Sequence, residues 1–408
     1  MINSGIIAVT FTPDEGAPTI HYTTDCSEPT EDDPIVTGPV FPVGGPTSGA
    51  VLRARAFQDG LWPGPICTNT YLVDAAPVGE LPIFSLVTEP DNLFDPDTGI
   101  YVLGPNAAGG PWFEGANFWN DWERPLHIEF FEEDGERELS MDAGTKIHGG
   151  FSRTLPQKSL RLMARGGYGD ADMDYAFFED LDNDEFESVI LRNSGNDFYF
   201  GLCRDPIVHL ASEGTGLDDM AYRPTIVYLN GDYWGLMSIR ERQDEDYLAY
   251  RHGVDPDKVD LLEHNLGVIE GSADHYQEML DYLRDNDMSD DTHFDVIASM
   301  VDVDNYAHYF THQIWANNTD WPQNNMKFWR AQEDGAKWRW LLYDTDFGLG
   351  LFGGPVTANA LTRLFNPTLG SVYARELFLE LMENEGFKRD FILRYADLLN
   401  TSLSPSAL

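Results

Sequence analysis

The sequence predicts an α+β protein in which a small all-β domain precedes a larger domain. Short alternating apolar runs separated by proline and glycine fill residues 1–78, and strand-like runs continue to about residue 242. Beyond about residue 243 the apolar residues recur at spacings of three and four, which indicates helices. We therefore expect one domain over residues 1–78 and a second over 79–408, the second divided into a strand-rich part (79–242) and a helical part (243–408).

The composition supports a large folded core and excludes some partners. The chain has 408 residues, of which 42% are hydrophobic and 13% aromatic, so one core is not enough and disorder is not expected. Lys and Arg number 26 against 69 Asp and Glu, a net charge of −43. This charge repels nucleic acids and anionic membranes, so we expect no nucleic-acid partner. It suits a saline or calcium-rich habitat and equally a merely solvated surface.

The N-terminal residues carry no targeting signal. The first ten residues lack a basic segment followed by an apolar one, and no run approaches the roughly 20 apolar residues of a membrane span. We expect a secreted or cell-surface protein of bacterial type whose targeting segment is absent from this sequence. Cys26 and Cys67 are close enough in sequence to form a disulfide, but spacing alone does not decide this.

The first domain carries few groups suited to catalysis. Strands are expected at 6–11, 19–22 and 51–56. Residues 21–25 read His-Tyr-Thr-Thr-Asp, with Ser-Glu-Pro at 27–29, and this pattern resembles the fibronectin-like β-domain at the C-termini of chitobiases and hexosaminidases. Cys26 stands where that pattern has glycine. The resemblance implies a β-sandwich that serves as a spacer or associates with polysaccharide.

The second domain begins with strands and ends with helices. An Asn230-Gly231 turn between two apolar runs is a strong hairpin signal, and Gly135 marks an earlier hairpin. The expected strands lie at 81–87, 127–131, 139–141, 158–162, 188–191, 225–229 and 233–239. The expected helices lie at 270–284, 304–317 and 373–384.

Two late motifs carry the oxygen ligands that phosphate transfer requires. Asn325 follows Asp320 by five positions, the spacing of the protein-kinase catalytic loop, where Asp meets the acceptor hydroxyl and Asn binds a metal ion. After expected strands at 326–329 and 338–343 come Asp344 and then Asp346-Phe347-Gly348, which matches the metal-binding Asp-Phe-Gly signature. Alternatively, Asp320 and Asn325 only shape a loop through side-chain hydrogen bonds.

An earlier segment gathers scarce basic residues. Gly149 and Gly150 precede Arg153, Lys158 and Arg161. Adjacent glycines allow backbone N–H groups to approach phosphate, and Lys158 opens a strand from which its ammonium could reach the α- and β-phosphates of ATP. The alternative is a plain turn whose basic residues neutralise nearby carboxylates.

Taken in order, these motifs resemble the CotH (spore-coat protein H) kinase family. The resemblance spans about residues 80–400 and rests on four blocks: Gly150 to Arg161; Leu191-Arg192-Asn193 with Arg204-Asp205; 229–241; and 343–348. It implies an atypical, two-lobed protein-kinase fold. The implied activity is transfer of phosphate from ATP to Ser or Thr of a secreted protein, with Mg²⁺ or Mn²⁺.

The resemblance also implies roles for individual residues. The catalytic residues are Asp320 and Lys158, and nucleotide binding falls to Ser152, Arg153 and Lys158. Asn325 and either Asp344 or Asp346 bind the metal. A helix around residues 196–212 takes the place of the kinase αC, where Asp205 pairs with Lys158, and Glu241 lies near the hinge beside the nucleotide. The usual Gly-x-Gly-x-x-Gly, His-Arg-Asp and Ala-Pro-Glu motifs are absent from the sequence. Adenylylation and glutamylation, which other kinase-like folds perform, therefore stay open.

Other features favour competing interpretations. The acidic run 170–185 is a solvated loop or a calcium site, and His308 and His312 are four apart on one helix face. Five tryptophans pack in a core or line a glycan groove: Trp112, Trp119, Trp122, Trp315 and Trp321. The rival to an enzyme is a catalytically silent surface module that binds polysaccharide or protein, and a glycoside hydrolase stays possible among so many acids.

Overall fold

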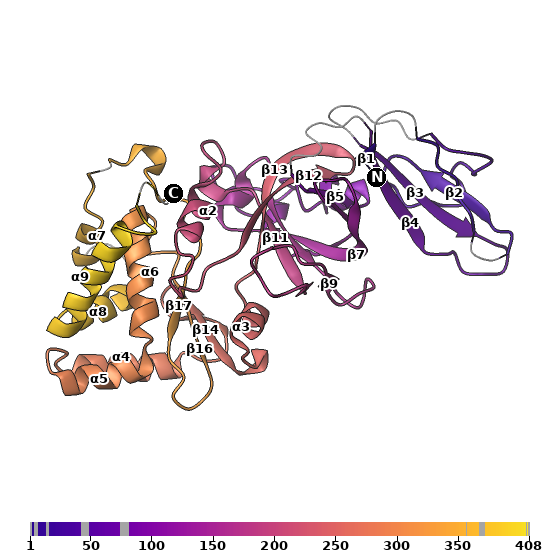
Figure 1. The fold of residues 1–408 in the computed structure, drawn as a ribbon. Coiled ribbons are helices and arrows are strands. Elements are labelled where there is room, and N and C mark those ends of the chain that lie inside the picture. The colour runs from indigo at the N-terminus through magenta and orange to yellow at the C-terminus, as the bar shows by residue number, and fades with distance from the viewer. Residues whose placement is uncertain are drawn as a thin grey trace. The chain divides into compact units, whose positions relative to one another are not determined.

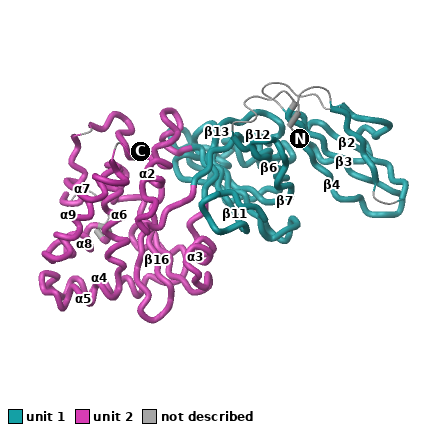
Figure 2. Tube along the Cα trace, viewed as in Figure 1, with its two compact units in different colours: residues 1–193, 222–240 teal, residues 194–221, 241–408 magenta. Residues whose placement is uncertain are grey.

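A computed structural model describes residues 2–3, 7–13, 16–41, 49–73, 81–355, 357–366, 372–404 and 406. The chain divides into two compact units, which Figure 2 colours separately. Unit 1 comprises residues 1–193 and 222–240, and unit 2 comprises residues 194–221 and 241–408. Helices and several sheets are both present, as an α+β protein requires.

The first strands of unit 1 form a four-stranded sheet in the order β1-β4-β3-β2 (Figure 1). Its members are β1 (Ile2–Asn3), β2 (Thr19–Thr23), β3 (Ala50–Phe57) and β4 (Ile66–Val73). The strand expected at 6–11 is represented by Val9, which forms an isolated bridge with Val40, whereas Ile6 lies outside the described residues. The expected domain boundary at 78/79 also lies outside them.

The two N-terminal cysteines are free thiols, so the disulfide considered from the sequence is not formed. Cys26 is buried beside Val51 and Val87, while Cys67 is exposed on β4. Burial raises the pKa of the Cys26 thiol to about 12, which keeps it protonated and unreactive.

Most of the other strands of unit 1 close into a barrel in the order β11-β13-β12-β5-β6-β7-β8 (Figure 1). Neighbouring strands are antiparallel except for the parallel pair of β12 and β5. The barrel strands are β5 (Ile83–Val87), β6 (Arg124–Phe131), β7 (Arg137–His148), β8 (Ser159–Met163), β11 (Ser188–Arg192), β12 (Tyr222–Leu229) and β13 (Asp232–Arg240). Apolar residues alternate along β7, where Leu139, Met141, Ala143 and Ile147 are buried, and this alternation is what an interior-facing strand requires.

Short elements connect the barrel strands. They are α1 (Pro90–Phe94), the 3₁₀-helices η1 (Asn117–Trp119) and η2 (Phe151–Thr154), and the two-stranded sheet of β9 (Met173–Asp174) and β10 (Glu185–Phe186). The acidic run predicted as a loop or calcium site therefore contains this small sheet.

Unit 2 combines a second sheet with helices (Figure 1). The sheet has the order β15-β14-β16-β17 and is antiparallel throughout, with β14 (Val259–Glu263), β15 (Gly267–Glu270), β16 (Lys327–Ala331) and β17 (Arg339–Leu341). The α-helices are α2 (Arg204–Leu210), α3 (Glu245–His252), α4 (Asp274–Asp285), α5 (Asp291–Met300), α6 (Val303–Ala316), α7 (Leu361–Phe365), α8 (Val372–Leu381) and α9 (Glu385–Leu399). The described part of the unit also contains the short 3₁₀-helices η3 (Gly195–Asp197), η4 (Pro256–Lys258) and η5 (Leu351–Gly353).

One expected helix differs from the structure. The helix predicted over 196–212 is instead η3 followed, after a turn, by the shorter α2. Ser194 and Leu202 adopt positive φ angles of 67° and 61°, which interrupt a continuous helix on both sides of residues 195–201. No helix among the described residues is long and apolar enough to cross a membrane.

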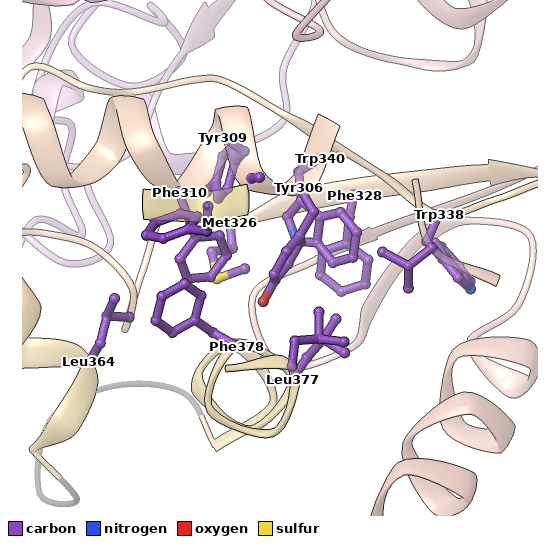
Figure 3. Close-up of a cluster of buried hydrophobic side chains, with 14 of the residues drawn as sticks. Tyr306, Tyr309, Phe310, Met326, Phe328, Trp338, Trp340, Leu364, Leu377 and Phe378 are labelled. Carbon is purple, nitrogen blue, oxygen red and sulfur yellow. The ribbon is translucent and has the colours of Figure 1, made fainter. Parts of the chain in front are cut away.

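Aromatic side chains from helices and strands make the core of unit 2 (Figure 3). Phe310 of α6 stacks on Phe378 of α8 with ring centroids 4.5 Å apart, and it also meets the edge of Trp321. On the sheet side, Trp340 and Phe328 stack at 5.7 Å, and Tyr306 of α6 contacts Trp340. The core therefore fixes α6 and the loop that follows it against the sheet.

Replacing Phe310 with alanine is expected to lower the free energy of unfolding by about 3–5 kcal/mol, because the substitution leaves a cavity among rings that cannot collapse. Urea unfolding measures this loss. The matched substitution Phe365→Ala, at a side chain that is 57% exposed, is expected to change the free energy by less than about 1 kcal/mol. Equal losses in the two variants would contradict this account of the core.

Candidate functional site

The loop after α6 is anchored by a tryptophan at its centre. Trp321 is fully buried, and its Nε1 donates to the hydroxyl of Tyr309 over 3.1 Å. It therefore belongs to the core, and the interpretation that it lines a glycan groove is wrong. Because Trp321 is held inside, its neighbour Asp320 is presented at the edge of the unit, where its side chain is half-buried.

Asn325 brings the two late motifs together. It has a positive φ of 54° and is 4% exposed. Its Nδ2 donates to Oδ2 of Asp320 over 3.2 Å and to the main-chain oxygen of Asp344, also over 3.2 Å. The catalytic-loop pair and the strand-end motif, predicted separately, therefore meet in unit 2.

A second amide supports the same contact. Asn318 is fully buried, and its Nδ2 donates to the main-chain oxygen of Asp344 over 3.4 Å and to Oε1 of Gln313 over 3.0 Å. Its Oδ1 accepts from the backbone N–H of Asp320 over 3.2 Å. Asn318 was not singled out from the sequence because no kinase motif includes that position. Asn318 nevertheless hydrogen-bonds both the loop that carries Asp320 and the strand end that carries Asp344.

The segment Asp344-Thr345-Asp346 is fixed by residues from an earlier part of unit 2. Asp346 is fully buried, and its Oδ2 accepts the backbone N–H of Asn196 over 2.8 Å. The backbone N–H of Thr345 donates to Oδ1 of Asp205 over 2.8 Å. Asp344 adopts a left-handed φ of 50°, so its carbonyl and side chain are turned out of the strand direction. Asn196 is another contributor that the sequence did not reveal.

The local electrostatics favour a cation. Burial raises the pKa of Asp320 above its ordinary value, and the nearby charge of Asp344 raises it further, against the lowering effect of hydrogen bonds from Asn324 and Asn325. Two carboxylates that repel each other are stabilised in their ionised form when a cation lies between them.

The donor set fits a hard divalent ion. Carboxylate, amide and main-chain oxygens are the ligands that Mg²⁺ takes in proteins, and it commonly uses one or two carboxylates together with substrate phosphates. Over the described ranges, no three His, Cys, Asp or Glu side chains are grouped closely enough to hold a metal ion unaided. A metal held by Asn325 with Asp344 or Asp346 would therefore depend on main-chain, water or phosphate oxygens as well.

Two further predicted residues act as anchors inside unit 2. Asp205, on α2, accepts from Thr345 and lies 3.6 Å from Nε2 of His209. Glu241 is fully buried, and its carboxylate accepts the backbone N–H of Ala221 over 2.5 Å and is paired with Arg251. Both carboxylates fix backbone segments, and their predicted roles beside a nucleotide stay predictions.

The basic residues predicted for phosphate binding lie in unit 1. The ammonium of Lys158 donates to the main-chain oxygens of Arg153 and Leu155 over 2.7 and 2.9 Å, and it lies 4.3 Å from the centre of the Phe118 ring. Burial lowers the pKa of Lys158 to about 8. Ser152 belongs to η2 within the same loop. Lys158 therefore braces the loop that follows Gly149 and Gly150.

Only glycine fits at position 149, where this loop begins. Gly149 has a φ of +99°, and a Cβ there would lie 2.4 Å from Oγ of Ser152. Arg153 reinforces the turn, because its Nε donates to the main-chain oxygen of Gly149 and its Nη1 to that of Phe118. Asn193, recognised only as part of a motif, donates to the main-chain oxygen of Gln157 over 2.6 Å and ties the far end of the loop to β11.

His308 and His312 do not form a metal site. His312 is fully buried, with its Nδ1 2.7 Å from the main-chain oxygen of His308 and its Nε2 3.2 Å from that of Ala211. Both ring nitrogens thus face carbonyl oxygens, which leaves no lone pair directed at a metal. Burial lowers the pKa of His308 to about 4, so it is neutral at pH 7.

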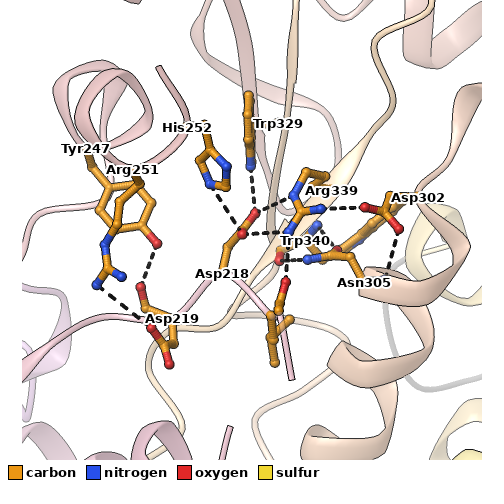
Figure 4. A network of polar contacts seen from close by, with 12 residues as sticks. Asp218, Asp219, Tyr247, Arg251, His252, Asp302, Asn305, Trp329, Arg339 and Trp340 are labelled. Atoms are coloured by element: carbon orange, nitrogen blue, oxygen red, sulfur yellow. Dashed lines mark hydrogen bonds and ion pairs between the residues drawn. The ribbon is translucent and has the colours of Figure 1, made fainter. Parts of the chain in front are cut away.

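An ion-pair network supports the strand that leads to Asp344 (Figure 4). Asp218 accepts from Nε and Nη2 of Arg339 over 3.0 and 2.8 Å and from Nε1 of Trp329 over 2.9 Å, and His252 lies 3.3 Å away. The backbone N–H of Leu342 donates to the main-chain oxygen of Asp218 over 2.7 Å. The network therefore fixes the strand end two residues before Asp344.

The stability of unit 2 is expected to fall in acid through Asp218. Burial raises the pKa of Asp218, but hydrogen bonds from His252 and Arg339 outweigh this effect and hold it at about 2, against an ordinary 3.8. A lowered carboxyl pKa stabilises the fold above pH 3.8, and the contribution is lost as pH falls through 2. Asp218→Asn should therefore cost about 2 kcal/mol at pH 7 and much less near pH 2.

Urea unfolding of the wild type and the variant across this pH range measures the effect. Asp281→Asn, at a side chain that is 63% exposed, is the control and should change stability by less than about 0.5 kcal/mol at either pH. A loss in Asp218→Asn that does not shrink in acid would contradict the assigned cause.

Comparison with known proteins adds a family. The family model described as CotH kinase protein matches residues 145–408, about two thirds of the chain. The match includes the loop after Gly149 and all of the late acidic segments. Among curated proteins no significant match is found.

Proposed function

The chain belongs to the CotH kinase family, and from that premise we propose that it is an atypical protein kinase that transfers the terminal phosphate of ATP to Ser or Thr hydroxyls of a protein acceptor. The observation that carries the proposal is the amide of Asn325, which joins the carboxylate of Asp320 to the main chain of Asp344. Phosphoryl transfer depends on positioning and charge stabilisation, and a rigid set of oxygens supplies both.

Each residue has a separate task in this proposal. Asp320 orients the acceptor hydroxyl and takes its proton as the bond to phosphorus forms. Its raised pKa makes it a better proton acceptor than an ordinary aspartate. Asn325, with Asp344 or Asp346, holds Mg²⁺ or Mn²⁺. When bound, such an ion neutralises the charge of the phosphate oxygens. Asn318 and Asn196 hold these groups in register.

The rest of the proposal concerns architecture and location. We propose that the barrel and unit 2 correspond to the two lobes of a kinase-like fold. The N-terminal four-stranded sheet would then be a fibronectin-like spacer that associates with polysaccharide. We further propose a secreted or cell-surface location, with which the acidic composition is consistent. The family membership supports a phosphoacceptor partner, whose identity lies outside the chain.

The alternatives to a protein kinase are another transfer reaction on the same fold and a silent surface module, and they predict different labelling results. Adenylylation uses the same metal and nucleotide but transfers the α-phosphate with its nucleoside, and glutamylation transfers no phosphate to the acceptor. A silent surface module would bind partners without metal-dependent nucleotide binding. The meeting of Asp320, Asn325 and Asp344 in one place favours an enzyme, because phosphoryl transfer needs such a group of oxygens and a silent module does not.

Incubation with γ- or α-labelled ATP and Mg²⁺ or Mn²⁺ tests the reaction. Label is expected from the γ-position alone, and Asp320→Ala and Asp346→Ala should each reduce transfer by at least about a hundredfold. Asp390→Ala, at a side chain that is 61% exposed, is the control and should transfer normally. Transfer from the α-position would instead establish adenylylation. If the protein neither transfers label nor binds ATP with metal, the result would support the silent surface module and contradict an enzyme.

A second test addresses the metal. Asn325→Leu should raise the Mn²⁺ concentration needed for half-maximal ATP binding by about tenfold or more, because an oxygen ligand is lost. Asn325→Asp keeps an oxygen at that position but loses the N–H groups that bond Asp320 and Asp344, so it should retain only part of the metal-dependent binding and still more than Asn325→Leu. Asn324→Leu, at the adjacent amide, should leave the metal requirement unchanged. An equal effect of the two leucine substitutions would contradict a ligand role for Asn325.

A further inference from the structure

Three phenylalanine rings contact one another at the surface of unit 2, and we call them the phenylalanine platform. The ring centroid of Phe352 lies 5.6 Å from that of Phe200 and 5.6 Å from that of Phe347, and both contacts are edge-to-face. Phe200 is 54% exposed and Phe352 is 66% exposed, whereas Phe347 is half-buried. Single exposed apolar residues are ordinary on a protein surface, whereas contiguous apolar patches mark sites of interaction.

The backbone around Phe352 holds its ring outward at a cost. Phe352 has a φ of 57° and a ψ of 23°, the left-handed region that is unfavourable for a bulky residue and free of strain for glycine. The backbone N–H of Leu351 donates to the main-chain oxygen of Gly348 over 3.1 Å, and that of Gly353 donates to Gly350 over 3.0 Å. These two tight turns bury Leu351 and leave Phe352 exposed.

The platform adjoins the candidate site. Phe347 directly follows Asp346 in the chain. Its main-chain oxygen accepts from the backbone N–H and from Oγ1 of Thr319, each over 3.4 Å, and Thr319 directly precedes Asp320. The platform therefore begins beside the carboxylate that is proposed to orient the acceptor hydroxyl and beside one that is proposed to hold the metal ion.

The surroundings of Phe200 make the platform suited to an uncharged group. The backbone N–H of Phe200 donates to the main-chain oxygen of Asp197 over 2.8 Å, which fixes the start of this segment. The guanidinium of Arg204 lies 5.8 Å from the centre of the Phe200 ring, and Arg204 is paired with the buried carboxylate of Asp197. Because the two charges offset each other, the exposed rings favour an apolar side chain over an ion.

We propose that the phenylalanine platform binds the acceptor protein and receives a large apolar side chain that lies next to the Ser or Thr to be phosphorylated. The proposal rests on the proposed kinase function, because that function brings the acceptor hydroxyl to Asp320. A large apolar side chain gains free energy when it leaves water and packs against exposed rings. The substrate class is therefore a protein segment in which Phe, Leu or Met lies beside the phosphorylated residue.

Fluorescence anisotropy with two labelled peptides tests the platform without catalysis. Both peptides carry one serine in an alanine–glutamine background, and the second has phenylalanine on each side of the serine. The whole chain, without nucleotide, should bind the second peptide at least about tenfold more tightly, the gain expected from burying one phenylalanine side chain.

Substitutions in the platform should remove this preference. Phe352→Gly should abolish it and keep an unfolding curve close to that of the wild type, because glycine suits a positive φ. Phe200→Ser should reduce the preference by at least about threefold, and it keeps the test open if Phe352→Gly does not fold. Phe41→Ser, at a residue of unit 1 that is 57% exposed, is the control and should retain the full preference.

The outcomes separate this inference from the proposed function. Equal binding of both peptides by the wild type, or an unchanged preference in the folded platform variants, overturns the inference whether or not the protein transfers phosphate. Loss of ATP binding in Phe352→Gly with an unchanged peptide preference also overturns it, because the rings would then stack on the adenine base. A preference that depends on the platform, in a protein that transfers no label, supports the inference and removes only the kinase function.

Discussion

The hydrogen bonds of the Asn325 side-chain amide are the interaction on which the candidate site depends. One amide group reaches the Asp320 carboxylate and the Asp344 main chain, so it fixes two acidic segments whose charges would otherwise keep them apart. The positive φ angles of Asn325 and Asp344 are part of the same arrangement, because each turns the backbone so that the groups converge. Beneath them, Trp321 and the aromatic core make the loop a rigid extension of α6.

The net negative charge of the chain is the second constraint on nucleotide binding. A protein with a net charge of −43 opposes the approach of a nucleotide unless cations are collected locally or supplied as metal ions. In unit 2, the amide of Asn325 brings carboxylate and main-chain oxygens together, and such oxygens are the ligands that suit a divalent ion. Ion pairs elsewhere, such as Asp218 with Arg339, use cations of the chain to fix backbone segments.

Much of the architecture was predictable from the sequence, because it follows from local patterns. The strands around Asn230-Gly231 and the helix before Asn317 have clear periodicity and turn signals, and the structure confirms them. The order of the four motif blocks, from Gly150 to Gly348, indicated the family that the comparison shows. The partners of these residues were not predictable. Asn196 meets Asp346 across 150 positions of sequence, and Asn318 meets Asp344 through a buried amide that no short motif contains. The helix expected over 196–212 was predicted too long, because the positive φ angles at Ser194 and Leu202 that interrupt it leave no signal in the sequence.

The central claim is that the oxygens ordered by Asn325 hold a divalent metal ion with the nucleotide. Anomalous diffraction from crystals grown with Mn²⁺ and a non-hydrolysable ATP analogue addresses it most directly, because the signal identifies the ion itself. The account predicts a manganese peak within about 2.5 Å of side-chain oxygens of Asn325 and of Asp344 or Asp346. A bound nucleotide whose manganese peak lies away from all three residues, or nucleotide bound without manganese, would contradict it.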